Sequence, residues 1–279
     1  MNVSVMGTPR CGRTVFLGLL YETVIRMTTE VCASDQEVIV NTGPVETKAF
    51  GDLRLELLSG RWPSAENRSK VSGCSLELGF RGKRGISFLR SSELRTVKLR
   101  DVPLGEKDIK VLRGSGLREV LQGSAGGSVD RYGLSERFRD SLESDAFILL
   151  ANVSNVRNEG DWPGEERDAF LATIVDNAAQ TRLGKVRKVT FIIVLTKTDR
   201  TRADDQKVFE EGYPRTSKAL QEAAKERGAA SHILVSWLGT VLDLNAEKVP
   251  ATLVREGQVQ IEYSDQEYRR LVSILGKLA

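Results

Sequence analysis

The fold of this chain follows from residues 3–21, which read Val-Ser-Val-Met (3–6), Gly-Thr-Pro-Arg-Cys-Gly-Arg-Thr (7–14) and Val-Phe-Leu-Gly-Leu-Leu-Tyr (15–21). The short apolar run predicts a β-strand, and the glycine-bracketed segment after it predicts a tight loop. Residues 13–29 then predict a helix, because Val15, Leu19, Leu20 and Val24 recur near one face. A strand that leads through a glycine loop into a helix is an arrangement that favours binding of an anion.

The loop has the Walker A spacing G-x-x-x-x-G-K-[ST], with Arg13 in the place of the lysine. Gly7 and Gly12 allow the backbone to wrap tightly, so that successive N–H groups can point at a phosphate. The dipole of the following helix adds positive potential, Arg13 adds a fixed positive charge, and the Thr14 hydroxyl could reach Mg²⁺. The plain alternative is a strand-to-helix turn that binds no ligand.

Composition limits the classes of function that remain. With 41 basic and 38 acidic residues among 279, the formal net charge is only +3, which argues against a nucleic-acid partner. No apolar run approaches the ~20 residues that cross a bilayer, and because Met1 leads straight into the first predicted strand we expect no signal peptide. Three cysteines at unrelated spacings suggest neither disulfides nor zinc. The single histidine, His232, precedes the apolar run at 233–235 and is expected at a strand start, where a structural role is favoured over a Ser-His triad. We therefore expect a cytoplasmic protein without a transmembrane segment.

Strands and helices alternate along the rest of the chain. Strands are expected at residues 74–80, 86–89, 94–99, 146–151, 189–195 and 233–235, with edge strands at 241–242 and 259–263. Helices are expected at 42–58 with Thr42 as N-cap, at 134–144, 163–182 and 214–227, and after a capping box that starts at Ser264. Residues 61–72 and 105–133 are expected to be loops. The pattern predicts an α/β fold with a parallel sheet covered on both faces, in one domain over residues 1–279.

Ligands of such a sheet bind beyond the carboxyl ends of its strands, where two short segments carry polar groups. Asp101 follows the strand at 94–99 and could hold Mg²⁺ through water, while the N–H of Gly105 could meet a γ-phosphate. An ordinary Asp-x-Pro turn is the alternative for this segment. Ser236 and Trp237 follow the strand at 233–235, where a tight turn would aim a backbone N–H at a guanine carbonyl.

A third strand end carries Thr196-Lys197-Thr198-Asp199, directly after the apolar strand at 189–195. The carboxylate of Asp199 can accept both the ring N–H and the exocyclic NH₂ of guanine, a pairing that adenine cannot offer. The aliphatic stem of Lys197 can lie across the base and the ribose. A polar turn without a ligand is the alternative here.

In this order, the motifs resemble those of P-loop GTPases of the Ras-like and translation-factor class, and the chain looks like a divergent prokaryotic member. The resemblance runs from Asn2 to about Leu275. It implies a three-layer P-loop NTPase fold with a mostly parallel central sheet, one antiparallel edge strand and an elaborated switch region at about residues 60–133. It also implies GTP or GDP and Mg²⁺ as ligands, with Thr14 and Asp101 at the metal. The residues that it implies for the nucleotide are Gly7, Arg10, Cys11, Gly12, Arg13, Thr14, Val15, Gly105, Thr196, Lys197, Asp199, Ser236 and Trp237.

These patterns predict a guanine-nucleotide-binding switch protein whose GTP hydrolysis is slow or depends on a partner, with a protein effector or activator as that partner. Arg13 would stabilise charge on the transferred phosphoryl group, and Glu106 is the nearest counterpart of a water-orienting glutamine. Arg13 in place of lysine and the stretched spacing from Asp101 to Gly105 favour an alternative, a pseudo-GTPase that serves as an interaction scaffold without turnover. A third alternative, an ATP-using P-loop enzyme, is disfavoured by the position of Asp199.

Overall fold

The computed structural model describes residues 1–29, 36–82, 94–106, 108–109, 135–154, 162–180, 188–198, 204–255 and 257–279. These form two compact units, each of which combines distant parts of the sequence. The first unit comprises Met1, Thr14–Asp101 and Ser236–Ala279, and the second comprises Asn2–Arg13 and Val102–Val235. The organisation as one domain over residues 1–279 stays a prediction.

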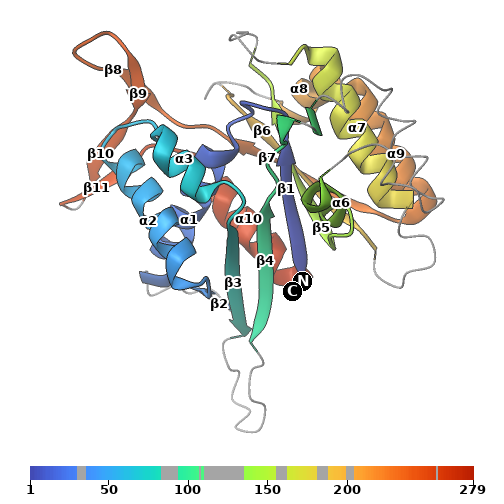
Figure 1. Cartoon of the computed structure of the whole chain (residues 1–279), viewed down its shortest axis with the longest axis horizontal. Coiled ribbons are helices and arrows are strands. Elements are labelled where there is room, and N and C mark those ends of the chain that lie inside the picture. The colour runs from blue at the N-terminus through green and yellow to red at the C-terminus, as the bar shows by residue number, and fades with distance from the viewer. Residues whose placement is uncertain are drawn as a thin grey trace, which may run out of the picture. The chain divides into compact units, whose positions relative to one another are not determined.

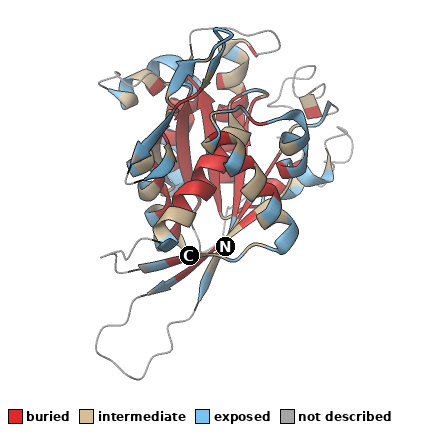
Figure 2. Ribbon diagram, turned by 90° about the vertical axis from the view of Figure 1, so that its left-hand side faces the viewer, coloured by how far each residue is buried: buried red, intermediate tan, exposed pale blue. Residues whose placement is uncertain are grey.

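The second unit is built on strands β1 (Asn2–Gly7), β5 (Ala146–Asn152), β6 (Thr190–Thr196) and β7 (Ala230–Ser236). β5 pairs in parallel with both β1 and β6, and Ile148 lies opposite Val5 on one side and Ile192 on the other. Every residue of β5 and β6 is buried, as expected for continuous apolar runs in a parallel sheet. The buried residues, red in Figure 2, gather in strands and in the helix faces that cover them.

The helices of the second unit are α6 (Glu136–Ser141), α7 (Gly164–Gln180), α8 (Asp205–Gly212) and α9 (Pro214–Arg227). α7 and α9 pack against each other, as Figure 1 shows. The Asp168 carboxylate of α7 accepts the N–H groups of Arg215 and Thr216 at 2.9 and 2.8 Å, which satisfies the first turn of α9. α9 begins with Pro214 and ends at Gly228, whose φ of 62° is the left-handed conformation of a helix C-terminus.

Among the described residues, the first unit contains more helices and strands than the second. Its helices are α1 (Arg13–Thr29), α2 (Pro44–Leu58), α3 (Ala65–Val71) and α10 (Asp265–Leu278). Its strands are β2 (Gln36–Val40), β3 (Ser75–Gly82) and β4 (Arg95–Asp101), together with the short strands β8 (Thr240–Leu242), β9 (Lys248–Pro250), β10 (Thr252–Arg255) and β11 (Gln258–Ile261). β3 pairs antiparallel with both β2 and β4.

One seven-stranded sheet has the order β2-β3-β4-β1-β5-β6-β7. The prediction of an α/β fold with a mostly parallel sheet is therefore confirmed. The antiparallel strand is β3, which lies second from the edge, and β2 is the edge strand. β2 and α8 had no counterpart among the expected elements, whereas the strand predicted at 86–89 and most of the loop predicted at 105–133 lie outside the described residues.

Two local predictions were wrong because hydroxyl groups bind other partners. Thr42 was expected to cap α2, but Gly43 is the N-cap, and the Thr42 hydroxyl instead accepts the N–H of Glu77 at 2.8 Å. Ser264 precedes α10 as predicted, yet its side chain makes no cap bond and accepts the N–H of Trp237 at 3.2 Å. The loop predicted at 61–72 contains α3, whose N-cap Ser64 accepts the N–H of Asn67.

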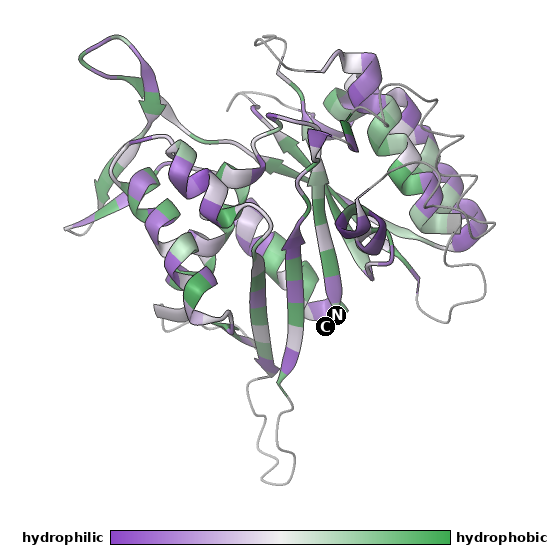
Figure 3. Cartoon of the chain, viewed as in Figure 1, coloured by the Kyte–Doolittle hydropathy of each residue, from purple (hydrophilic) through white to green (hydrophobic). Residues whose placement is uncertain are grey.

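The strands predicted at 241–242 and 259–263 exist, but they form two separate hairpins and do not join the seven-stranded sheet. β8 pairs with β9, and β10 pairs with β11. In the second hairpin Val254 lies opposite Val259, and both are exposed. Figure 3 shows hydrophobic segments of both hairpins in green. Among the described residues, no helix has the length and apolar character needed to cross a membrane.

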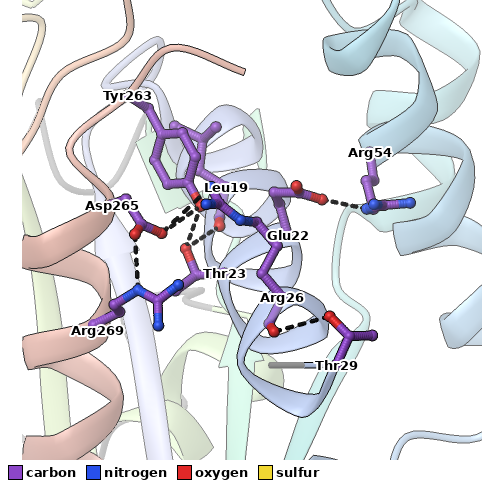
Figure 4. A network of polar contacts seen from close by, with 9 residues as sticks. All are labelled: Leu19, Glu22, Thr23, Arg26, Thr29, Arg54, Tyr263, Asp265 and Arg269. Atoms are coloured by element: carbon purple, nitrogen blue, oxygen red, sulfur yellow. Dashed lines mark hydrogen bonds and ion pairs between the residues drawn. The ribbon is translucent and has the colours of Figure 1, made fainter. Parts of the chain in front are cut away.

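A polar network fixes α1 within the first unit (Figure 4). Glu22 of α1 is buried and forms an ion pair with Arg54 of α2. Thr23, one residue further on, shares a hydrogen bond of 2.8 Å with the hydroxyl of Tyr263, which also donates to Asp265 at 3.0 Å. Because buried polar groups are costly unless they are paired, this network specifies how α1 packs against its neighbours in this unit.

Candidate phosphate-binding loop

The strand, loop and helix predicted for residues 3–29 are present with nearly the expected boundaries. β1 ends at Gly7, residues 8–12 form the loop, and α1 begins at Arg13. The N–H of Cys11 donates to the carbonyl of Thr8 at 3.2 Å, which closes a turn inside the loop. A Cβ at Gly7 would lie 2.5 Å from the Cys11 sulfur, so this position requires glycine.

The backbone of the loop alternates in handedness. Arg10 has a φ of 61° and Gly12 has a φ of 92°, on either side of Cys11. Left-handed residues beside right-handed ones turn successive N–H groups toward one side, a conformation that forms anion-binding concavities. The first N–H groups of a helix have no intrahelical acceptor, so the start of α1 adds donors to the same end of the loop. The geometry of the loop therefore suits an anion such as a phosphate.

The loop is tied to the end of β6 within the second unit. The hydroxyl of Thr196, the last residue of β6, donates to the carbonyl oxygen of Cys11 at 2.7 Å. Both residues are buried, and a Cβ at Gly12 would lie 3.9 Å from the Thr196 Cβ. The structure thus brings together the ends of two predicted motifs that lie 185 residues apart in the sequence.

Lys197 continues this second segment in an uncommon conformation. Its φ is 56°, its side chain is exposed, and Thr198 after it has a buried hydroxyl with no hydrogen-bond partner among the described residues. Non-glycine residues with positive φ are uncommon and concentrate at functional sites. Asp199, the residue predicted to bind guanine, lies outside the described residues.

Positive charge lies near the loop at the carboxyl end of β5. Arg167 Nη1 and the hydroxyl of Tyr213 both donate to the carbonyl oxygen of Asn152, each at 2.9 Å. Burial raises the pKa of Tyr213 well above its usual range, an effect that the Arg167 guanidinium opposes and that nearby Cys11 reinforces. Tyr213 is therefore a neutral donor at neutral pH, and the guanidinium supplies the local charge.

Asp101, predicted as a metal ligand, lies at the end of β4 in the first unit. It is buried, and one carboxylate oxygen accepts the N–H of Gly73 at 3.0 Å. Thr14, the other predicted ligand, lies in the first turn of α1. One hydroxyl and one carboxylate fit Mg²⁺, which commonly uses one or two protein oxygens together with phosphates and water. Among the described residues, no cluster of three acidic, cysteine or histidine side chains could hold a metal by itself.

Gly105, predicted to meet a γ-phosphate, has its N–H directed to a carboxylate in this structure. The acceptor is Asp108 Oδ2, at 3.1 Å, and Glu106 between them is exposed. The same carboxylate accepts the N–H and the hydroxyl of Ser135 at 2.7 and 2.9 Å. Sequence reasoning missed Asp108 and Ser135, because a capping box is recognised by a serine or threonine three residues before the acid, and glycine stands at that position here.

Ser236 and Trp237 lie at the end of β7 and just beyond it, in the first unit. The Ser236 hydroxyl lies 2.5 Å from the hydroxyl of buried Tyr268 in α10. The chain after Trp237 is extended, with a bridge from Leu238 to Tyr263, where a tight turn was predicted. The N–H of Trp237 donates to Ser264, so this amide is used inside the unit. A role of these two residues at a guanine base stays a prediction.

No protein-family model matches the sequence, and no curated protein matches it. Among solved structures, the chain is similar to the S. cerevisiae Ski7 GTPase-like domain, bound to GTP, with 14% sequence identity and a TM-score of 0.44. The match covers 100% of this chain and 50% of that one, so this chain spans about half the length of its structural relative. The function is therefore argued from the residues of this chain.

Proposed function

We propose that the protein binds a guanine nucleotide and acts as a switch whose GTP hydrolysis is slow or depends on a partner. The observation that carries this proposal is the hydrogen bond from Thr196 to the Cys11 carbonyl. It places the loop suited to phosphates beside the start of the Thr196–Lys197–Thr198–Asp199 segment, whose residue types suit a purine. The two ends of one nucleotide need two such segments at a fixed separation.

In this proposal the phosphates lie against the N–H groups of the loop and of the first turn of α1. Arg13 supplies charge to the outer phosphates, and Mg²⁺, held by Thr14 and Asp101, would neutralise charge on the phosphoryl group. Asp199 accepts the two guanine N–H donors, and the stem of Lys197 covers the base. Gly105 would donate its N–H to the γ-phosphate, which distinguishes GTP from GDP.

A pseudo-GTPase that binds the nucleotide without turnover is the second candidate. Two observations favour it: Arg13 replaces a compact lysine with a planar fork, and the N–H of Gly105 is bonded to Asp108. Phosphate release from GTP, measured with and without Mg²⁺, separates the candidates. If Arg13→Lys creates release that the natural protein lacks, the natural protein is the pseudo-GTPase.

Calorimetry with GDP and ADP tests the nucleotide assignment. We expect the protein to prefer GDP and Asp199→Ala to abolish that preference, because the alanine removes the paired acceptor. Glu211→Ala in α8 is the control, since it removes one negative charge from an exposed position and should leave the preference unchanged. Equal binding of GDP and ADP, or binding of neither, would refute the assignment of guanine.

A further inference from the structure

Asp108 is a buried carboxylate to which the functions proposed above assign no contact with the nucleotide. It is 1% exposed and accepts three hydrogen bonds in the second unit. Oδ1 accepts the N–H of Ser135 at 2.7 Å, while Oδ2 accepts the Ser135 hydroxyl at 2.9 Å and the N–H of Gly105 at 3.1 Å. A buried charge persists only when donors surround it, and these three donors satisfy that condition.

The donors around Asp108 are of the kind that hold a phosphate oxygen. Backbone N–H groups and a serine hydroxyl recognise carboxylates and phosphates alike, because both present anionic oxygens. A single N–H makes one strong hydrogen bond at a time, so the Gly105 amide cannot serve Asp108 and an incoming phosphate together. Binding of that phosphate requires the Gly105 to Asp108 bond to break.

We infer that Asp108 is an internal competitor of the γ-phosphate, and that its carboxylate sets the preference between GTP and GDP. This inference rests on the proposed function, in which Gly105 contacts the third phosphate. The two phosphates of GDP contact only the loop at residues 7–14 and leave the hydrogen bond from Gly105 to Asp108 intact. A triphosphate reaches Gly105 only by displacing the carboxylate, so the competition lowers affinity for GTP alone.

The test compares the dissociation constants of GTPγS and GDP for the wild type and for Asp108→Asn by calorimetry. The amide keeps the shape of the side chain and removes its charge. We expect the affinity for GTPγS to rise by about tenfold relative to GDP, the factor that one charge-assisted hydrogen bond commonly contributes. An unchanged ratio of the two affinities would overturn the inference.

Asp168→Asn is the matched control. Asp168 is 3% exposed in the same unit and also accepts two N–H groups and a hydroxyl, from Arg215 and Thr216. Its amide variant loses the same charge and the same kinds of hydrogen bond at a place that does not involve Gly105. We expect Asp168→Asn to lower the stability of the protein and to leave the ratio of its GTPγS and GDP affinities at the wild-type value. If Asp168→Asn raises the affinity for GTPγS as much as Asp108→Asn does, Asp108 has no specific role.

Nuclear magnetic resonance of the wild type gives a second readout, which does not depend on the folding of a variant. The carboxyl-carbon shift of Asp108 and the amide shift of Gly105 should both change on saturation with GTPγS and stay constant with GDP. Constant shifts with both bound nucleotides would overturn the inference and leave the guanine assignment standing. If the wild type binds neither nucleotide, the proposed function fails, and the inference fails with it.

Discussion

Replacing Thr196 with valine tests whether the bond between β6 and the loop matters for a ligand. Valine keeps the shape of threonine and removes the hydroxyl that donates to the Cys11 carbonyl at 2.7 Å. Thr196 is 4% exposed and Cys11 is 1% exposed, so water cannot replace the lost donor without opening the site. Removing one partner of a buried hydrogen bond costs about 1–3 kcal/mol, and we expect Thr196→Val to lower the free energy of unfolding by about 2 kcal/mol.

Urea denaturation measures the stability, and calorimetry with GDP measures the affinity. With a slope of about 2 kcal/mol/M, a loss of about 2 kcal/mol shifts the unfolding midpoint by roughly 1 M. Thr196→Ser keeps the donor and deletes one buried methyl group, which costs about 1 kcal/mol. Both variants should lose stability, but only the valine variant should lose GDP affinity. If Thr196→Ser lowers the affinity for GDP as much as Thr196→Val does, or if Thr196→Val leaves that affinity unchanged, the hydrogen bond has no role in ligand binding.

Three further predictions concern stability, each measured by urea unfolding. Gly12→Ala should cost about 1–3 kcal/mol, because its φ of 92° strains any side chain although the added Cβ would make only an ordinary contact with the Thr196 Cβ. Gly51→Ala in α2, where a Cβ meets nothing within 4 Å, should gain about 0.5–1 kcal/mol, and equal effects of the two substitutions would contradict the backbone argument. Tyr263→Phe should lower the free energy of unfolding by about 1–3 kcal/mol, because it removes the hydrogen bonds of the Tyr263 hydroxyl to Thr23 and Asp265. An unchanged free energy of unfolding would show that the polar network does not stabilise the fold. Burial raises the pKa values of Tyr213 and Tyr263 above the ordinary 10.0, so the unfolded chain loses these two protons at a lower pH than the folded chain does. The free energy of unfolding should therefore fall as the pH rises above 10.0. A free energy of unfolding that stays constant between pH 9 and 11, on the order of one unit either side of the ordinary pKa, would contradict this.

The elements that the sequence predicted well are those whose signal is local. β5 and β6 are continuous apolar runs, and complete burial on both faces is what such runs require in a parallel sheet. α9 carries its own boundaries, with Pro214 in the first turn and Gly228 in the left-handed conformation after the last. Boundaries of this kind depend on backbone dihedral angles, which a single residue can fix.

The predictions that were wrong depended on partners far away in the sequence. Thr42 and Ser264 both have the residue type and spacing of an N-cap, yet their hydroxyls bind Glu77 and Trp237. A capping bond contributes only about 1 kcal/mol, so a competing backbone donor of another segment can outweigh it. The sequence cannot indicate which donor will be nearby, because that is decided by the packing of whole elements.

In the candidate site, too, the local features were predicted from the sequence and the contacts between distant segments were not. The apolar run at residues 3–6, the glycine spacing at 7–14 and the helical periodicity after it were enough to predict the strand, the loop and the first residue of α1. The bond from Thr196 to Cys11 was not predicted, because it joins the ends of two parallel strands whose order in the sheet is a tertiary property. The partnership of Gly105 with Asp108 was missed for the opposite reason, since it is a local bond of the capping-box kind, but a glycine in place of serine or threonine gives no capping-box signal.

Strain in the two segments supports the role that we propose for the bond between them. Arg10 and Lys197 each hold a left-handed conformation that costs on the order of 1–3 kcal/mol in a non-glycine residue. Loops with no other constraint would relax, so the surrounding structure must maintain these angles. The buried parallel pairing of β1, β5 and β6 supplies rigid ends, and the Thr196 hydroxyl joins the loop to one of them. The loop is thereby shaped before any ligand arrives, which lowers the entropy lost on binding and favours a site over an incidental turn.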